Sequence, residues 1–155
     1  MSADDLPPVS ELVPHGGGVI LLDRVLEHDG ESTTTRVTVA KQKWLKRADG
    51  SAASWVAFEY MAQCIAAHEG IRALLEGRPP VRGSVAAAFG VRVYRSRFEA
   101  DEVLRVRTNQ VRGRPGLGVL SHYCAIHEDG EPGEDLLLAE GRLSISILRP
   151  SHDVG

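Results

Sequence analysis

The sequence is poor in cysteine. Only Cys64 and Cys124 occur among 155 residues, and neither belongs to a CxxC pair, which excludes a zinc ribbon and a disulfide framework. Both stand among apolar residues, where buried free thiols are common. A chain of this length buries roughly 68–70% of its unfolded surface on folding, so one core without cross-links suffices. We expect a single domain over residues 1–155, with its core at about 11–149.

Long apolar runs and clusters of basic residues are missing too. No apolar run approaches the ~18 residues of a membrane span, and the acidic start MSADDLPPVSELVPH lacks the apolar core of a signal peptide. The 18 basic residues are scattered among 21 acidic ones, with a net charge of −3, which disfavours nucleic acid as a partner. We therefore expect a cytoplasmic protein that binds neither nucleic acid nor membrane.

Signals for metals and cofactors are also absent. The glycines at 16–18 are followed by neither GKS nor GxGxxG, so a phosphate-binding loop is not expected. Cys64 and His68 are four residues apart, but two ligands do not make a metal site. We expect no cofactor and no metal.

One segment, residues 54–75, is long enough to form a major helix. Its apolar side chains lie nearly all round, as in a helix that is buried on most sides. Ser51 or Ser54 is expected to cap its start, and Gly70 within it marks a bend or a close approach. The helix carries a carboxylate near its start, Glu59, where an apolar segment would not require one.

The other segments have the patterns of strands. Residues 19–29 form a short apolar run and residues 31–40 alternate buried and exposed positions, with a turn near Asp29 and Gly30 between them. Four strand-like stretches follow the helix, at 81–98, 102–113, 116–130 and 136–148. The pattern predicts an α+β fold in which a curved antiparallel sheet wraps a long central helix. One sheet covers only part of such a helix, so a second copy of the chain is expected to cover the rest.

Three motifs, in this order, resemble the hotdog-fold 3-hydroxyacyl-acyl-carrier-protein dehydratases. The first, LVPHGGGVILLDRVLEHD, is similar to that family's LPHRxPxLLLDRV segment, and EYMAQ at residues 59–63 is similar to its helical E(A/Y)MAQ signature. The third, AAAFGVRVYRSRFEADEVLRVR, resembles its glycine-centred strand and the xLxV strand that follows. The resemblance covers about residues 11–149. The form WVAFEYMAQ resembles the branch associated with aryl-polyene biosynthesis.

The resemblance implies a reaction and an assembly. The reaction is dehydration of a 3-hydroxyacyl thioester to the trans-2-enoyl thioester, carried on the phosphopantetheine arm of an acyl carrier protein, in fatty-acid or polyene-type lipid synthesis. The assembly is a hotdog dimer with a continuous sheet, in which each active site pairs a histidine of one chain with the helix carboxylate of the other. By position, Glu59 is that carboxylate and the amide near Ser54 is an oxyanion-hole donor.

One position departs from the family. The family's catalytic histidine lies in a GHFP loop fourteen residues before the helix acid, which here is Leu45, and no histidine occurs between His28 and His68. His15, in the matched PHGGG segment, is the best replacement for it. The alternative is a structural histidine that is hydrogen-bonded in a turn.

The chemistry of dehydration sets the roles to be filled. Proton-transfer groups typically contribute ~10²–10⁴-fold, and a helix N-terminus supplies donors for the thioester oxygen. Glu59 suits the first role, and the amides near Ser54 and Trp55 suit the second. The alternative for Glu59 is an ordinary carboxylate that faces a gap or pairs with an arginine such as Arg24. Gln63, one turn further on, hydrogen-bonds Glu59 or a ligand, or else caps a buried backbone group.

Further candidates flank the helix in sequence. Arg92, Arg95 and Arg97 can form a basic patch for an acidic carrier protein and its phosphopantetheine phosphate, or they are solvated charges on a strand. Trp44 and Trp55 lie on either side of the helix start, where they line an acyl pocket or pack in the core.

Three functions remain open at this point. The leading hypothesis is a hotdog dehydratase that acts on acyl-carrier-protein thioesters as a homodimer or higher homo-oligomer, with Glu59 as the acid/base and His15 as its partner. The second is a non-catalytic hotdog subunit that forms a heteromer with an active dehydratase, which the missing histidine favours. The third is an acyl thioesterase on the same fold, in which Glu59 directs water at the carbonyl.

Overall fold

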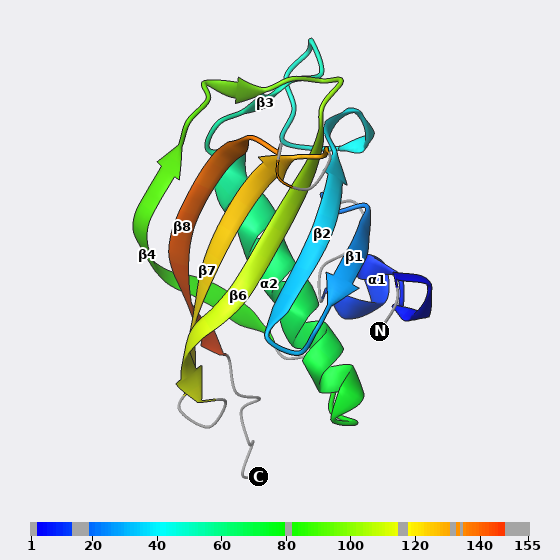
Figure 1. Ribbon diagram of the computed structural model, residues 1–155, viewed down its shortest axis with the longest axis vertical. Coiled ribbons are helices and arrows are strands. Elements are labelled where there is room, and N and C mark those ends of the chain that lie inside the picture. Colours follow the sequence, from blue (N-terminus) through cyan, green and yellow to red (C-terminus); the bar gives the residue numbers. More distant parts are fainter. Residues whose placement is uncertain are drawn as a thin grey trace, which may run out of the picture.

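A long helix crossing a curved sheet dominates the architecture. The computed structural model describes residues 3–13, 19–79, 82–114, 118–130, 133 and 135–147. Helix α2 (Val56–Leu75) runs across one face of a six-stranded antiparallel sheet (Figure 1). The strand order is β1-β2-β6-β7-β8-β4, so the predicted α+β arrangement is confirmed.

The sheet is built mostly from the second half of the chain. Its strands are β1 (Arg24–His28), β2 (Ser32–Thr38), β4 (Gly83–Val93), β6 (Val103–Arg114), β7 (Val119–Glu128) and β8 (Leu137–Ile147). A separate two-stranded ribbon joins β3 (Ala52–Ala53) to β5 (Arg97–Phe98). The short helix α1 (Val9–Leu12) packs beside α2, and two single 3-10 turns lie at Ala3–Asp5 and Val39–Lys41.

Alternation along the strands puts apolar side chains against α2. In β6, Leu104 and Val106 are fully buried, whereas Arg105 and Arg107 between and after them are on the other face. Burying such a side chain contributes roughly 1.5–3 kcal/mol relative to leaving it exposed. The predicted one-sided sheet is therefore present, and its apolar face forms the core with the helix.

One stripe of α2 is left partly uncovered by the sheet. Glu59, Ala62, Ala66 and Glu69 follow one another at spacings of three, four and three residues, and all four are half-buried. Most other residues of the helix are buried, as the all-round apolar pattern predicted. The two glutamates thus lie at the two ends of a single stripe.

The ends of α2 are set by backbone contacts. The prediction of a serine cap is wrong: the N-cap is Trp55, without a side-chain cap bond. The Ser51 hydroxyl donates instead to Asp49. At the other end Gly77 has a φ of +66°, and the amides of Gly77 and Arg78 donate to the carbonyls of Leu74 and Ala73. This Schellman arrangement ends the helix.

Gly70 is a point of close approach, as the sequence indicated. A Cβ at this position would lie 2.3 Å from the carbonyl oxygen of Leu12. The absence of a side chain at Gly70 therefore lets α1 pack directly against α2.

The first predicted strand is shorter than expected. Residues 19–29 were expected to form it, but β1 starts at Arg24. The reason is that side chains satisfy the backbone before that point: Gln63 accepts a hydrogen bond from the Leu21 amide and donates one to the Val19 carbonyl. The predicted stretch 81–98 is likewise split into β4 and β5, and β5 pairs with β3, which the sequence did not indicate.

No helix among the described residues is long and apolar enough to cross a membrane.

Candidate active site

Glu59 lies in the first turn of α2 and faces a cavity. The cavity has a volume of about 280 Å³ and is mostly apolar. Its walls come from α2, from the start of β4 and β7 and from the end of β8: Glu59, Ala62, Ile65, Ala66, Glu69, Gly83, Ser84, Val85, Leu120, Ile145 and Ile147. A carboxylate in the first helical turn is favoured by the positive end of the helix dipole. The alternative ion pair with Arg24 is absent, since no basic side chain in the described part of the chain pairs with Glu59.

Gln63 holds Glu59 in place and joins the helix to the chain before β1. Its Nε2 donates to Glu59 Oε1 over 3.0 Å and to the Val19 carbonyl over 2.8 Å. Its Oε1 accepts from the Leu21 amide over 2.7 Å. The two contacts that the sequence left as alternatives for Gln63, to Glu59 and to buried backbone, are therefore made together.

Trp44 contacts the same point of the backbone. Its indole Nε1 donates to the Val19 carbonyl over 2.7 Å, so this carbonyl accepts from both Trp44 and Gln63. These bonds anchor the segment next to residues 14–18. His15, the candidate partner of Glu59, lies outside the described residues.

The start of α2 offers free donors and exposed aromatic surface. Among the described residues, no acceptor is bonded to the amides of Ser54 or Trp55, whereas the amides of Ala57 and Phe58 donate to the carbonyls of Ser54 and Trp55. Trp55 is 57% exposed and Phe58 is 40% exposed. Trp55 therefore does not pack in the core of a single chain.

Leu45 stands where the resemblance expects a histidine. Its φ of 57° makes it the one non-glycine residue with a left-handed backbone among the residues described. This conformation is uncommon for a leucine and is adopted more readily by asparagine, aspartate and histidine. No histidine in the described part of the chain lines the cavity beside Glu59.

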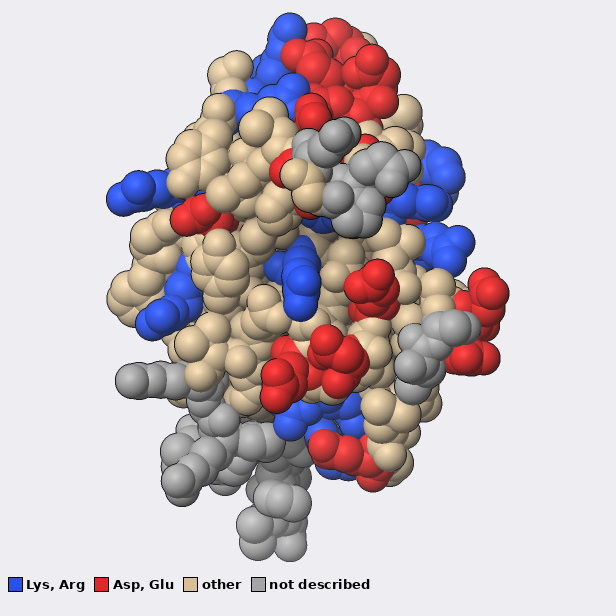
Figure 2. All heavy atoms as spheres, in the orientation of Figure 1, with Lys and Arg blue, Asp and Glu red and all other residues tan. Residues whose placement is uncertain are grey.

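The three arginines of the predicted basic patch differ in their surroundings. Arg95 pairs with Glu102 and Glu128, and Arg97 pairs with Glu99 and Asp49. Arg92 is exposed on β4, and no ion pair of it occurs among the described residues. On the outer face of the sheet, basic and acidic side chains are interspersed rather than separated (Figure 2).

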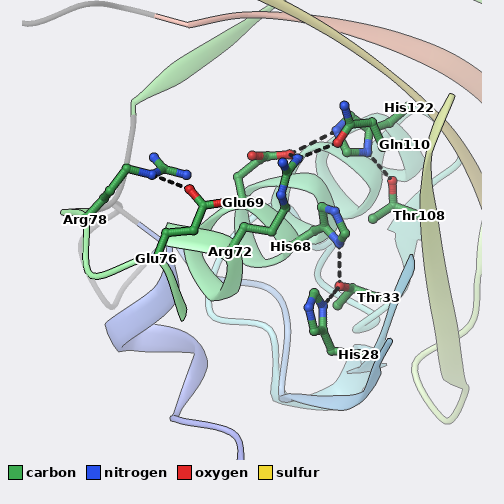
Figure 3. A network of polar contacts seen from close by, with 10 residues as sticks. All are labelled: His28, Thr33, His68, Glu69, Arg72, Glu76, Arg78, Thr108, Gln110 and His122. Carbon is green, nitrogen blue, oxygen red and sulfur yellow. Dashed lines mark hydrogen bonds and ion pairs between the residues drawn. The ribbon is translucent and has the colours of Figure 1, made fainter. Parts of the chain in front are cut away.

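A second polar network lies further along α2 and was missed by the sequence reasoning. In this network Glu69 lies 3.5 Å from Arg72 Nη1 and 3.4 Å from His122 Nε2 (Figure 3). His122 is fully buried and its Nδ1 lies 3.1 Å from the Thr108 hydroxyl. The spacing 59, 62, 66, 69 was the available signal, since it places Glu69 on the same stripe as Glu59.

Two more histidines extend the network into the core. The Thr33 hydroxyl contacts His28 Nδ1 at 2.8 Å and His68 Nδ1 at 2.7 Å. Because a hydroxyl donates one proton, it can donate to one of these nitrogens while the other donates to it. The pKa of His68 is lowered to about 4, mainly by burial. The negative charge of Glu69 opposes this shift, whereas His122, His28 and Arg72 add to it. Both rings are therefore neutral near pH 7, since burial also lowers the pKa of His28.

The cysteines and acidic groups give no sign of a metal centre. Burial raises the pKa of Cys64, and it raises that of Cys124 to about 12, so both remain protonated and unreactive. Within the described ranges, no group of three or more histidine, cysteine, aspartate or glutamate residues is placed to hold a metal ion.

The helix across a curved sheet, with a glutamate of its first turn in an apolar cavity, defines a hotdog-fold protein. A solved chain of the dehydratase heterocomplex ApeI:P from Xenorhabdus doucetiae matches it with a TM-score of 0.84, at 23% identity over 93% of both chains. The ApeP dehydratase family (ApeP-like) matches residues 7–152. The chain therefore belongs to the ApeP dehydratase family.

More distant structures share the fold alone. The PaaI protein of the phenylacetic acid degradation operon of E. coli matches with a TM-score of 0.57, at 13% identity over 79% of this chain and 80% of that one. A hypothetical thioesterase from Streptococcus pneumoniae TIGR4, solved with coenzyme A, gives 0.54 at 11% identity over 81% and 84%. No curated protein matches the sequence.

Proposed function

We propose that this protein takes part in the dehydration of 3-hydroxyacyl thioesters of an acyl carrier protein to trans-2-enoyl thioesters, in fatty-acid or polyene-type lipid synthesis. The observation that carries the proposal is Glu59, a carboxylate at the N-terminus of a buried helix that Gln63 holds at the wall of an apolar cavity. Membership of a dehydratase family supports the same reaction.

Each part of the site has a role in this proposal. Glu59 transfers the proton between the substrate and the leaving hydroxyl group, and Gln63 keeps its carboxylate oriented. The amides of Ser54 and Trp55 donate to the thioester oxygen as negative charge develops on it. The aromatic surfaces of Trp44 and Trp55 border the acyl chain, and His15 is the candidate second proton-transfer group.

The carrier protein is the proposed macromolecular substrate. Phosphopantetheine carries a phosphate, and arginine is well suited to bind it. Arg92 is the best candidate, because Arg95 and Arg97 already share their charge with neighbouring carboxylates. Arg95 and Arg97 remain part of the proposed carrier-protein surface because they lie close to Arg92 in the sequence. Their charges are not free to bind the phosphate alone.

Assembly with a second hotdog chain completes the proposal. Strand β4 is the last strand of the sheet, and its residues are exposed along most of their length. A long apolar edge strand of this kind favours pairing with another chain. The second chain is either a copy of this one or a different hotdog protein.

The heteromer defines a second candidate function, that of a non-catalytic partner subunit. It is favoured because no histidine of the described part lines the cavity, and because the chain is similar to one from a dehydratase heterocomplex. In this function the other subunit supplies the complete catalytic pair, and the present chain supplies the other half of the interface.

One experiment separates these functions. The purified protein is incubated with a 3-hydroxyacyl carrier protein, alone and mixed with a hotdog dehydratase that has the complete GHFP motif, and loss of water is followed by mass spectrometry. Dehydration by the protein alone supports the leading proposal. No activity alone, together with a rate in the mixture that exceeds the rate of the second enzyme by itself, supports the partner subunit. Release of free acid indicates a thioesterase.

A pair of variants then tests the role of Glu59 in proton transfer. Glu59→Gln should reduce dehydration by about 10²-fold or more, since a positioned proton-transfer group is lost. Glu76→Gln, on the exposed end of the same helix, is the matched control and should leave the rate unchanged. Full activity of Glu59→Gln would overturn the assignment of Glu59.

A further inference from the structure

The cavity has a carboxylate at each end of its helical wall. Glu59 and Glu69 both line it, and between them the wall consists of Ala62, Ile65 and Ala66. Ten residues of α-helix separate the two glutamates, which corresponds to about 15 Å along the helix axis. The strands add apolar side chains to the same cavity, from Val85, Leu120 and Ile145.

Glu69 is held in the ionised form. Burial opposes its ionisation, but the contact from His122 and the charge of Arg72 outweigh it, so the pKa of Glu69 lies below its usual value. The 3.4 Å contact between His122 Nε2 and Glu69 Oε1 is too poorly aligned to be a full hydrogen bond. Both atoms are buried, and neither has a hydrogen-bond partner among the described residues.

The surroundings of Glu69 fix its position as well as its charge. Arg72 also donates to Gln110 on β6, and His122 on β7 contacts Thr108 on β6 (Figure 3). The Glu69 side chain is only 17% exposed. A carboxylate fixed in this way at a cavity wall cannot swing out to bulk water when the cavity fills.

These properties select the chemistry of a ligand. An ionised carboxylate accepts hydrogen bonds and donates none. A ligand that ended in a plain alkyl group at this point would remove water from Glu69 without replacing it, which is unfavourable. A hydroxyl or ammonium group at the same point would donate a charge-assisted hydrogen bond.

We propose that the cavity binds an acyl chain whose far end carries a hydrogen-bond donor, and that Glu69 is the residue that accepts from it. The inference rests on the proposed function, in which the thioester end of the chain lies beside Glu59. It makes Glu69, with His122 and Arg72 as its supports, the specificity-determining residue of the site. The hydroxyl and the ammonium group share the same chemistry and are distinguished by experiment.

The test measures binding rather than turnover. Pantetheine thioesters of decanoic, ω-hydroxydecanoic and ω-aminodecanoic acid are titrated into the purified protein by isothermal calorimetry. We expect at least one donor-tipped chain to bind about tenfold or more tightly than the decanoyl chain, because a hydrogen bond to a charged group discriminates by this order. A tighter ω-amino chain identifies an ammonium ligand, and a tighter ω-hydroxy chain identifies a hydroxyl ligand.

Variants connect the preference to the residue. Glu69→Met should bring the affinities for all three chains within about twofold of one another, and Glu69→Gln, which keeps the shape and an acceptor, should lose the preference for the ω-amino chain. Glu76→Gln is the control and should behave as the native protein. Circular dichroism confirms that each variant is folded.

The outcomes also separate this inference from the proposed function. Tight binding of decanoyl thioester without preference for a donor-tipped chain overturns the role of Glu69 and leaves the proposed function standing. A preference for a donor-tipped chain that survives in folded Glu69→Gln and Glu69→Met also overturns the role of Glu69 and leaves the proposed function standing. Absence of binding by all three thioesters overturns both.

Discussion

Gln63 Nε2 donates to Glu59 Oε1 over 3.0 Å, from one helical turn further along α2. The same nitrogen donates to the Val19 carbonyl, and the amide oxygen of Gln63 accepts from Leu21. One side chain therefore sets both the orientation of the candidate proton-transfer group and the path of the chain before β1. A change at Gln63 should consequently alter stability and activity together.

Replacing Gln63 by methionine should test both effects. Methionine has a similar size, but it leaves the Leu21 amide without its acceptor, which costs about 1–3 kcal/mol of unfolding free energy. Glu59 also loses its orienting donor, so kcat for dehydration should fall by about tenfold with little change in KM. Urea unfolding and a dehydration assay measure the two quantities.

A second variant at this position separates positioning from packing. Gln63→Glu retains an acceptor for Leu21 but places a like charge beside Glu59, which disfavours ionisation. The pH–rate profile should then shift to higher pH. An unshifted profile, or a kcat of Gln63→Met equal to that of the native protein, would remove Gln63 from the mechanism.

Acid should destabilise the protein before its carboxylates titrate. The pKa of His68 is lowered to about 4, mainly by burial, from an ordinary value of 6.5. Between these values the unfolded chain binds a proton that the native protein does not, so the free energy of unfolding falls as the pH falls from about 6.5 to 4. For His68 alone the total loss is about 3 kcal/mol.

Urea unfolding at a series of pH values checks this expectation. His28, whose pKa is also lowered by burial, adds to the slope. Glu69 adds to it at lower pH, because the His122 contact and the charge of Arg72 hold the pKa of this carboxyl below its usual value against the opposing effect of burial. His68→Gln should be less stable at pH 7 but should show a flatter pH dependence. His127→Gln, on the less buried part of β7, is the control. An equal slope in native protein and His68→Gln would contradict the assignment.

The sequence predicted the parts of the fold that depend on local patterns. Strict alternation in β6 and the all-round apolar pattern of α2 are visible in the order of residues, because the sheet and the helix repeat with fixed periods. Glu59 was found because a carboxylate interrupts that apolar pattern. The strand order β1-β2-β6-β7-β8-β4 depends on contacts between distant segments, which local patterns do not encode.

The features that were missed depend on tertiary contacts. Residues 19–23 have the composition of a strand, but the Gln63 side chain, more than forty residues away, takes the hydrogen bonds of Val19 and Leu21. Glu69 was not singled out from the sequence, and only the partly uncovered stripe of α2 makes it part of the wall of the cavity. The role of His122 likewise appears only when β7 is placed beside the helix.

Gly70 should not tolerate a side chain. A Cβ would lie 2.3 Å from the Leu12 carbonyl oxygen, so Gly70→Ala forces α1 away from α2. Such overpacking costs about 1–3 kcal/mol, and the better helix propensity of alanine returns about 1 kcal/mol at most. We expect a net loss of up to about 2 kcal/mol in urea unfolding. Glu76→Ala, at the C-cap of the same helix, is the control. A stabilised Gly70→Ala would show that α1 moves without cost.

Phe89 should mark the contact with the second chain. It is 57% exposed on β4, the edge strand, so Phe89→Lys changes little in a single chain but places a charge on the pairing edge. We expect at least tenfold weaker association by analytical ultracentrifugation, with unchanged circular dichroism. Tyr123→Lys is the matched control, because Tyr123 is an exposed aromatic residue on the central strand β7 and flanks the same residue, Arg142, from the other side. Equal weakening by both variants, or by neither, would place the interface elsewhere than at the β4 edge.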